Sequence, residues 1–359
     1  MLAGLKVEPA ALVAKHGEAR ARQLFDISLE SIGRLEALVA SEGIACEYER
    51  TGHIQAAWKR SHFDHFRQEQ ALLARVFKHR VELVPESEQR SELGSDAYHG
   101  LLIDERSGAI NPAQYVHGLA EAATRAGASV MAHTPVRRII KQRAGWRVAI
   151  GEGNTDWEID AADVLWATNG YADAATPRLQ RRFIPIGSYI IVTEPLGLSV
   201  PTRLLPRRRM VFDSKNFLYY FRLTSDNRLL FGGRAEFSQP TRETARRAAG
   251  ILRTGMVAVF PELADTQVEF AWGGNVAFTR DQMPRAGRLG DGTYYAGGYC
   301  GHGIAMATYL GEIIARRIAG ETVDHPLVDD RFAAIPLYRG RPWFLPIVGA
   351  YYKALDLIG

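Results

Sequence analysis

Tyr295-Ala-Gly-Gly-Tyr-Cys-Gly-His-Gly303 is the stretch that decides how this 359-residue chain is interpreted. It continues a strand predicted over residues 293–296 and leads into a helix whose apolar face is Ala307, Leu310, Ile314 and Ile318. Because glycine has no side chain, a planar or anionic ligand can approach the backbone N–H groups of such a turn. The start of the helix adds positive potential. Tight packing of the helix on the strand is the alternative explanation for the glycines.

A similar alternation of helix and strand precedes this stretch. Asn111 is a suitable N-cap, and Pro112 stands at the first position of a helix that Gly127 ends. Short strands are predicted at residues 129–132, 146–150, 156–159 and 163–167, the last of the buried type, with a turn at Gly151-Glu-Gly-Asn154. This order predicts a parallel sheet that carries a small β-meander.

The other segments differ in character. The first ~40 residues have a helical apolar period. Strands at 46–58 and 81–85 surround a polar helix at 63–76, which indicates an inserted second domain. Residues 189–274 are mostly strand, with a hairpin of residues 217–222 and 228–233 and a helix at 242–259.

Composition favours an ordinary globular enzyme. The net charge is +4, but 44 basic residues are nearly balanced by 40 acidic ones, and the clusters Arg178, Arg181, Arg182 and 207–209 lack interleaved aromatics. We therefore expect a solvated basic surface and no nucleic-acid partner.

The cysteines and the apolar segments bear on localisation. Cys46 and Cys300 cannot make a disulfide framework, which fits a cytoplasmic location. No cysteine and histidine pair has the spacing of a zinc site, so no metal is expected. No run approaches the ~18 apolar residues of a membrane span. Prolines at 336, 342 and 346 interrupt the apolar tail, which should pack on the body.

Four separated segments resemble the glycine-oxidase, sarcosine-oxidase and D-amino-acid-dehydrogenase family of FAD-dependent oxidoreductases. They are Gly298-Tyr-Cys-Gly-His-Gly-Ile304, Leu165-Trp-Ala-Thr-Asn-Gly170, the stretch from Asn111 through Val136, and the stretch from Trp272 to Pro284. Within the family, Ala167-Thr-Asn-Gly-Tyr171 and Leu230-Phe-Gly-Gly233 are most similar to gamma-glutamylputrescine oxidoreductases.

The resemblance implies a set of cofactor-binding residues. Val136 would offer its backbone to the adenine, and Ala167, Thr168, Asn169 and Gly170 would pass the pyrophosphate and ribitol. The flavin ring would be held by Gly298, Cys300, Gly301, Gly303 and Ile304. In sarcosine oxidases, the cysteine that holds FAD covalently falls at a position near Gly274 of this chain, whereas Cys300 stands elsewhere. The resemblance therefore implies noncovalent FAD.

The resemblance also implies a reaction, in which a hydride moves from the carbon beside an amine nitrogen to flavin N5 and the imine hydrolyses to an aldehyde. His302 and Tyr299 are the candidate catalytic groups at the ring, although His302 is equally suited to capping its helix. Tyr219, Tyr220 and Arg222 are candidates for the substrate pocket, although alternate strand positions are by default one core face and one wet face.

Three departures from the family pattern are informative. Amino-acid oxidases place a carboxylate-binding arginine where Gly301 stands, so an amine is favoured. The lysine implicated in oxygen activation in sarcosine oxidases is absent from residues 229–232, so fast reaction with oxygen is not expected, and oxygen or another electron acceptor stays open. The family opens with a strand and a Gly-x-Gly-x-x-Gly helix, whereas this chain begins after them, so we expect a truncated sequence or a late start codon.

Two alternatives stay open. One is a D-amino-acid or sarcosine-type dehydrogenase or oxidase, and the other is a cofactor-free fragment without activity. In each case the fold class is mixed α/β (α+β). An incomplete FAD-binding Rossmann-like domain (residues 1–44, 98–186 and 277–325) is interleaved with an antiparallel-sheet substrate domain (45–97 and 187–276) and followed by a tail (326–359).

Overall fold

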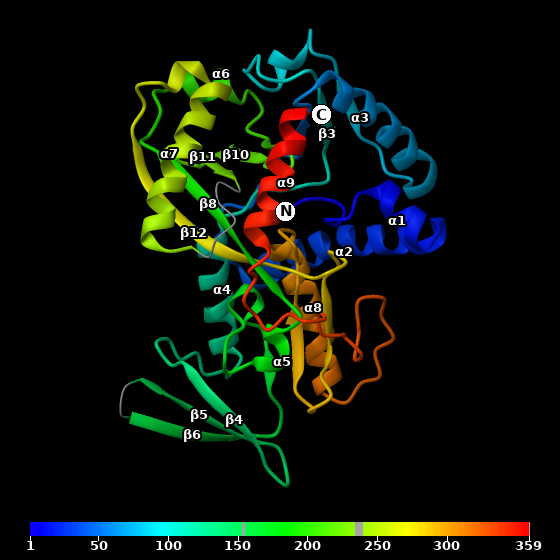
Figure 1. Ribbon diagram of the computed structural model, residues 1–359, viewed down its shortest axis with the longest axis vertical. Coiled ribbons are helices and arrows are strands. Elements are labelled where there is room, and N and C mark those ends of the chain that lie inside the picture. The colour runs from blue at the N-terminus through cyan, green and yellow to red at the C-terminus, as the bar shows by residue number, and fades with distance from the viewer. Residues whose placement is uncertain (153–154, 234–239, 359) are drawn as a thin grey trace.

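The computed structural model describes residues 1–152, 155–233 and 240–358, and its mixture of helices and sheets confirms the α/β class expected from the sequence (Figure 1). The helices are α1 (Pro9–His16), α2 (Glu18–Glu42), α3 (Arg60–Leu72), α4 (Pro112–Arg125), α5 (Pro177–Gln180), α6 (Val200–Leu204), α7 (Arg242–Val259), α8 (Gly303–Ile318) and α9 (Leu345–Ile358). Shorter helical turns are η1 (Leu73–Phe77), η2 (Gln89–Ser91), η3 (Asn169–Tyr171) and η4 (Pro261–Leu263).

An eight-stranded sheet occupies the upper half of Figure 1, with strand order β12-β8-β11-β10-β9-β1-β3-β2. Its strands are β1 (His53–Ala56), β2 (Glu82–Val84), β3 (Leu101–Asp104), β8 (Ile184–Thr193), β9 (Met210–Asp213), β10 (Tyr219–Leu223), β11 (Leu229–Gly233) and β12 (Val268–Phe278). All pairs are antiparallel except β1 with β9. Alternate residues such as Ile191, Phe221 and Phe231 pack in one core with Leu252 and Met256 of α7.

A smaller sheet lies in the lower half of the molecule, in the order β13-β14-β7. Its strands are β7 (Leu165–Trp166), β13 (Arg285–Arg288) and β14 (Tyr294–Gly297), and β14 runs parallel to β7. One face packs on α2 and α8, as Tyr294 and Ala296 share a core with Leu24 and Leu310. A meander of β4 (Val136–Lys141), β5 (Trp146–Glu152) and β6 (Thr155–Ala161) hangs below.

Several predicted elements are confirmed in the structure. Asn111 caps α4 by accepting a hydrogen bond from the Gln114 amide, and α7 has the predicted bounds. The hairpin of β10 and β11 and the β5 and β6 strands of the meander also form as expected, whereas the third meander strand, β4, was not predicted. The turn between β5 and β6 includes residues 153 and 154, which lie outside the described residues.

Other expectations were wrong. Residues 129–132 form no strand, because none of the described strands lies beside them to share a ladder. The buried strand at 163–167 shrinks to β7, and Leu165 is exposed because β7 pairs with β14 alone among the described strands. The N-terminal helix divides at Gly17, whose φ of 75° is not helical, and Gly52, with φ 70°, delays the strand predicted from residue 46.

The expectation of a solvated basic surface is wrong at Arg209. Its side chain is buried because it pairs with Glu92 and Glu105, whereas Arg207 stays largely exposed. The division into interleaved domains remains a proposal.

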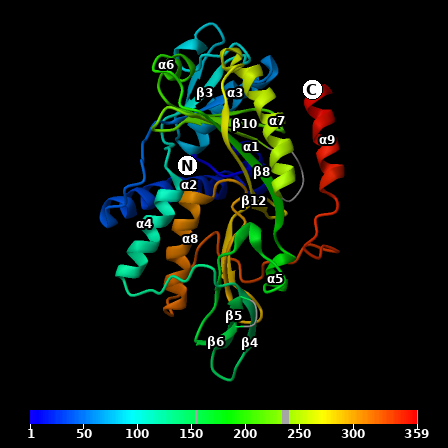
Figure 2. The same ribbon diagram turned by 90° about the vertical axis from the view of Figure 1, so that its left-hand side faces the viewer.

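The C-terminal segment crosses the body before its last helix. Phe332, Tyr338 and Leu345 are buried, and Pro346 stands near the start of α9, where the missing N–H has no helical partner. Figure 1 and Figure 2 show α9 at the same height as α7 and the large sheet. Among the described residues, no helix is both long and apolar enough to cross a membrane.

Candidate flavin-ring site

The turn between β14 and α8 depends on positive φ angles. The φ angles of Gly298 (75°), Cys300 (53°) and Gly301 (99°) are all positive. A Cβ on Gly298 would stand 2.4 Å from Cγ2 of Thr279, whereas one on Gly301 would meet nothing within 4 Å. Gly298 is therefore required for packing, while Gly301 leaves an open approach to the N-terminus of α8.

Asn169 ties this turn to the one that follows β7. Its side-chain Oδ1 accepts a hydrogen bond of 3.0 Å from the Gly298 amide, and its own φ is 46°. The next residue, Gly170, has no room for a Cβ, which would lie 2.7 Å from the carbonyl oxygen of Asn275. The structure thus brings Asn169 and Gly170 together with Gly298, although the two turns are more than a hundred residues apart in the sequence.

The remaining sequence candidates of the two sheets lie around this junction. Ala167 and Thr168 are exposed at the end of β7. Val136 is half-buried and packs on the cluster that contains Trp166 and Tyr295, on the meander side of the small sheet. Cys300 is buried, and its Sγ donates to the Gly298 carbonyl at 3.2 Å, so the thiol turns inward.

A cavity of about 80 Å³ opens at the N-terminus of α8. It is lined by Met1, Leu2, Gly4, Ser28, Ser31 and residues 301–306. His302 stands at the N-cap position but makes no capping hydrogen bond with its side chain. Its buried Nδ1 has no partner among the described residues, and burial lowers its pKa to about 3. The imidazole is therefore neutral and retains hydrogen-bonding capacity at the cavity.

Tyr299 does not join His302 at this cavity. Its ring packs instead against the core between the small sheet, α2 and α8. Burial raises the pKa of its hydroxyl well above the ordinary value. Residues of the same turn can point in different directions, so the sequence alone could not show that Tyr299 and His302 lie in different surroundings.

The two faces of β10 divide the substrate-pocket candidates. Tyr219 lies on the α7 side, where its ring is 5.0 Å from that of Phe231 and 3.6 Å from Nζ of Lys215. Tyr220 lies on the opposite face and shares a 2.9 Å hydrogen bond with Ser188. Arg222 follows on this second face and donates to the Ile110 carbonyl at 3.0 Å. Of the three candidates for the substrate pocket, Tyr220 and Arg222 thus face away from the α7 core, and Tyr219 faces it.

Sequence reasoning missed His53 and its partners on this second face. His53 stacks on Phe212 with ring centroids 5.3 Å apart, and its Nδ1 is 2.7 Å from Oγ of Ser107. The Ser107 hydroxyl also accepts from the Ala3 amide at 3.0 Å, which connects His53 to the segment that walls the cavity. No local pattern could have found His53, because its place on this face follows from the pairing of β1 with β9, two strands distant in the sequence.

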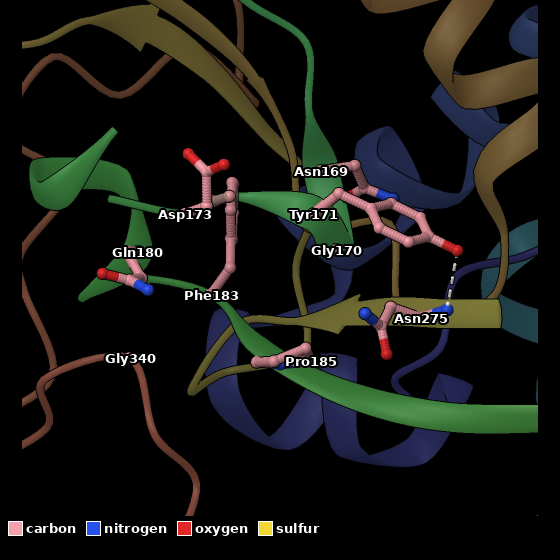
Figure 3. Close-up of a pocket in the computed structure, with 10 residues that line it drawn as sticks. Asn169, Gly170, Tyr171, Asp173, Gln180, Phe183, Pro185, Asn275 and Gly340 are labelled. Atoms are coloured by element: carbon pink, nitrogen blue, oxygen red, sulfur yellow. Dashed lines mark hydrogen bonds between the residues drawn. The ribbon is translucent and has the colours of Figure 1, made fainter. Parts of the chain in front are cut away.

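A larger cavity of about 300 Å³ lies on the other side of the Asn169 turn (Figure 3). It is lined by Asn169, Gly170, Tyr171, Ala172, Asp173, Gln180, Phe183, Pro185, Asn275 and Gly340. The hydroxyl of Tyr171 accepts a hydrogen bond from the Asn275 amide at 3.1 Å, drawn as a dashed line in Figure 3. The two cavities share no lining residue.

The imidazoles of His53, which is buried, and His302, which is half-buried at the cavity, predict acid sensitivity. Burial lowers their pKa values to about 4 and about 3, respectively. At pH values below the ordinary histidine pKa of about 6.5, the unfolded chain therefore binds more protons than the folded chain, and the free energy of unfolding decreases as the pH is lowered. Asp213, whose pKa burial raises to about 6, acts oppositely between about pH 6 and 4. We expect the urea midpoint to fall between pH 7 and pH 5, with a smaller fall in a His53→Asn/His302→Asn double variant. An equal fall in both proteins would contradict this assignment.

Comparisons with known proteins agree with this geometry. The family model described as FAD dependent oxidoreductase matches residues 7–317. The chain is 30% identical over 348 residues to a probable oxidoreductase OrdL of Haemophilus influenzae, covering 95% of this chain and 78% of that protein. It is also 30% identical over 352 residues to the gamma-glutamylputrescine oxidoreductase of Escherichia coli, covering 96% and 79%.

Solved structures share the fold. Glycine oxidase from Geobacillus kaustophilus superposes with a TM-score of 0.72 at 20% identity, covering 88% of this chain and 84% of that one. L-proline dehydrogenase from P. horikoshii gives a TM-score of 0.69 at 20% identity, covering 85% and 81%.

Proposed function

Because the chain belongs to the family of FAD-dependent oxidoreductases, we propose that it binds FAD noncovalently and uses it to oxidise a C–N bond of an amine. The ring site is the turn from Gly298 to Ile304. The observation that carries this proposal is the combination, at one cavity, of an open Gly301, a helix N-terminus and a His302 Nδ1 that has no hydrogen-bond partner in the described part of the chain.

The residues present fit one edge of a flavin ring. The pyrimidine edge of a reduced flavin carries negative charge, which the N-terminus of α8 favours. The space above Gly301 admits a close approach to the backbone, and His302 offers one further hydrogen bond. The cavity of about 80 Å³ holds only such an edge, so the rest of the ring would lie outside it.

Residues outside the α8 turn are proposed to contact the other parts of the cofactor. In this proposal Ala167, Thr168, Asn169 and Gly170 contact the pyrophosphate and ribitol, and the backbone of Val136 contacts the adenine. Both cysteines are buried, and the Cys300 thiol is turned into its own turn, which supports noncovalent binding and a reducing, cytoplasmic compartment.

Bound FAD would supply the acceptor for the hydride that leaves the carbon next to nitrogen. The chain's own residues bind and orient the amine between the α8 turn and the face of the large sheet that carries Tyr220 and Phe212. A neutral His302 holds the ring edge by a hydrogen bond without placing a second cation beside the substrate. The oxidised product is an imine, which water hydrolyses to an aldehyde.

The substrate is proposed to be an amine of the gamma-glutamylputrescine kind. The Escherichia coli relative carries that name, and the family resemblance implies an arginine in amino-acid-oxidising members at the position of Gly301. The test is to purify the chain, add FAD and record its visible spectrum, and then to assay putrescine derivatives and D-amino acids with oxygen and with an artificial acceptor. Loss of flavin on gel filtration would refute cofactor binding, and activity on D-amino acids alone would refute the amine assignment.

Asn169→Ala is expected to weaken FAD binding about tenfold, because it leaves the Gly298 amide without its acceptor. The dissociation constant can be measured by flavin fluorescence. Asn227→Ala is the matched control, since Asn227 also has positive φ (60°) and a side-chain oxygen that accepts a hydrogen bond, here from Arg208. It should lower the melting temperature comparably without changing FAD affinity, and equal affinity losses in the two variants would contradict the role of Asn169.

A further inference from the structure

Arg222 is a half-buried guanidinium with little to balance it. Its one hydrogen bond within the described residues is the donation from Nη2 to the Ile110 carbonyl, and no carboxylate there lies within 4.0 Å. Burial lowers its pKa, while the more distant Glu47 and Glu49 act in the opposite direction. Arg209 on the neighbouring strand β9 differs, because two glutamates and a carbonyl accept from its guanidinium.

The surroundings of Arg222 connect it to the candidate site. It shares a sheet face with Tyr220, whose cross-strand neighbour is Phe212. Its charge also acts on the amino group of Met1, a residue that lines the cavity at α8. Its acceptor Ile110 belongs to the core that Ile304 and Ala305 enter at the start of α8. Arg222 therefore lies on the large sheet close to residues that pack against the start of α8 or line its cavity.

We propose that Arg222 binds a carboxylate of the substrate, so that the enzyme prefers amines carrying a carboxylate away from the reacting carbon. A guanidinium that has lost much of its hydration and has no ion-pair partner gains most from a bidentate carboxylate. The carboxylate would lie away from the reacting carbon because Arg222 comes from β10 and not from the ring-edge turn. That turn, which has Gly301 and no arginine, offers no cationic side chain for an α-carboxylate. The inference rests on the proposed amine oxidation for its catalytic consequence but not for carboxylate binding itself.

Binding is tested first, without turnover. Titration calorimetry with glutarate, which has no amine to oxidise, is performed on the chain with and without FAD. We expect Arg222→Gln to weaken glutarate binding by about 10- to 100-fold. Arg60→Gln is the control for charge loss, since the Arg60 side chain is 81% exposed and should leave binding unchanged. Equal glutarate affinity in wild type and Arg222→Gln, or no binding by wild type, overturns the proposal.

Kinetics then test substrate preference. The series glycine, beta-alanine, gamma-aminobutyrate and delta-aminovalerate is compared with alkylamines of matched length. We expect the longer amino acids to have KM values at least about tenfold below those of the alkylamines, and Arg222→Gln to abolish this difference with little change in kcat. An equal KM increase for both series overturns the proposal.

Two outcomes separate this proposal from the proposed function. If no amine is oxidised but glutarate binding depends on Arg222, the reaction assignment fails and the carboxylate site stands. If Arg222→Gln does not fold, Arg222→Lys decides, because lysine keeps the charge but not the bidentate geometry. Glutarate binding should then weaken at least about threefold, and unchanged binding overturns the proposal.

Discussion

Gly298→Ala is expected to abolish FAD binding and to destabilise the fold by about 3 kcal/mol. Two effects combine, since the residue has φ 75° and its new Cβ would stand 2.4 Å from Cγ2 of Thr279 and 3.0 Å from the ring of Phe183. The measurements are urea denaturation and flavin fluorescence titration. Because the clash involves a buried methyl group and a core ring, neither neighbour can move without disturbing the turn that carries the ring site.

Two further variants separate the clash from the backbone strain. Gly301→Ala has a similar positive φ (99°) but meets no atom, so it should cost only about 1 kcal/mol. Gly298→Ala combined with Thr279→Ser removes the clashing methyl and keeps the hydroxyl that donates to the Met283 carbonyl. This double variant should recover roughly half of the lost stability relative to Thr279→Ser alone. Equal losses in Gly298→Ala and Gly301→Ala would show that packing against Thr279 is unimportant.

Arg209→Met should cost about 3 kcal/mol, because it leaves the buried carboxylate of Glu92 without its buried cationic partner. The guanidinium is 4% exposed and bonds Glu92 at 2.9 Å, Glu105 at 2.6 and 2.8 Å, and the Thr51 carbonyl at 2.8 Å. Without it, the buried carboxylate of Glu92 keeps only the partly exposed Arg207. Thermal and urea unfolding at pH 7 measure the effect.

The control for this prediction is a neighbouring exposed pair. Arg203→Met breaks an ion pair with Glu262 in which the side chains are 55% and 36% exposed, so a loss of no more than about 1 kcal/mol is expected. Adding Glu92→Gln to Arg209→Met should restore part of the stability, because the stranded charge is removed. If Arg209→Met proves no worse than Arg203→Met, the buried network does not stabilise the sheet.

Local signals predicted much of the fold. Asn111 and Pro112 mark the start of α4 by their own chemistry, and the apolar spacing predicted the part of the α8 core face that contains Leu310 and Ile314. The errors occur where tertiary pairing decides the outcome. Residues 163–167 have the apolar character of an inner strand, yet β7 has two residues because β14 is its one partner in the described chain. Arg209 is one of three consecutive arginines, and only the arrival of Glu92 and Glu105 distinguishes it.

The candidate site was predictable in its backbone and not in its side chains. The glycines of the α8 turn and the Asn169 turn were visible as patterns that require particular φ angles, and the structure joins them through one hydrogen bond. Which way Tyr299, Tyr219 and His53 point depends on strand register and on neighbours distant in sequence. No local period contains that information.

The parallel pairing of β1 with β9 also bears on how the protein folds. His53 pairs with Met210 and Ala56 with Asp213, so the large sheet joins two stretches whose separation in the sequence includes α3, α4, the meander and β8. During synthesis, β1 to β3 emerge roughly 5 to 20 seconds before β9 at typical elongation rates. Over that interval the β1 edge presents unpaired backbone groups and apolar side chains such as Ile54 to other chains. We therefore expect late closure of this edge to make folding of the nascent chain sensitive to expression temperature and assisted by chaperones.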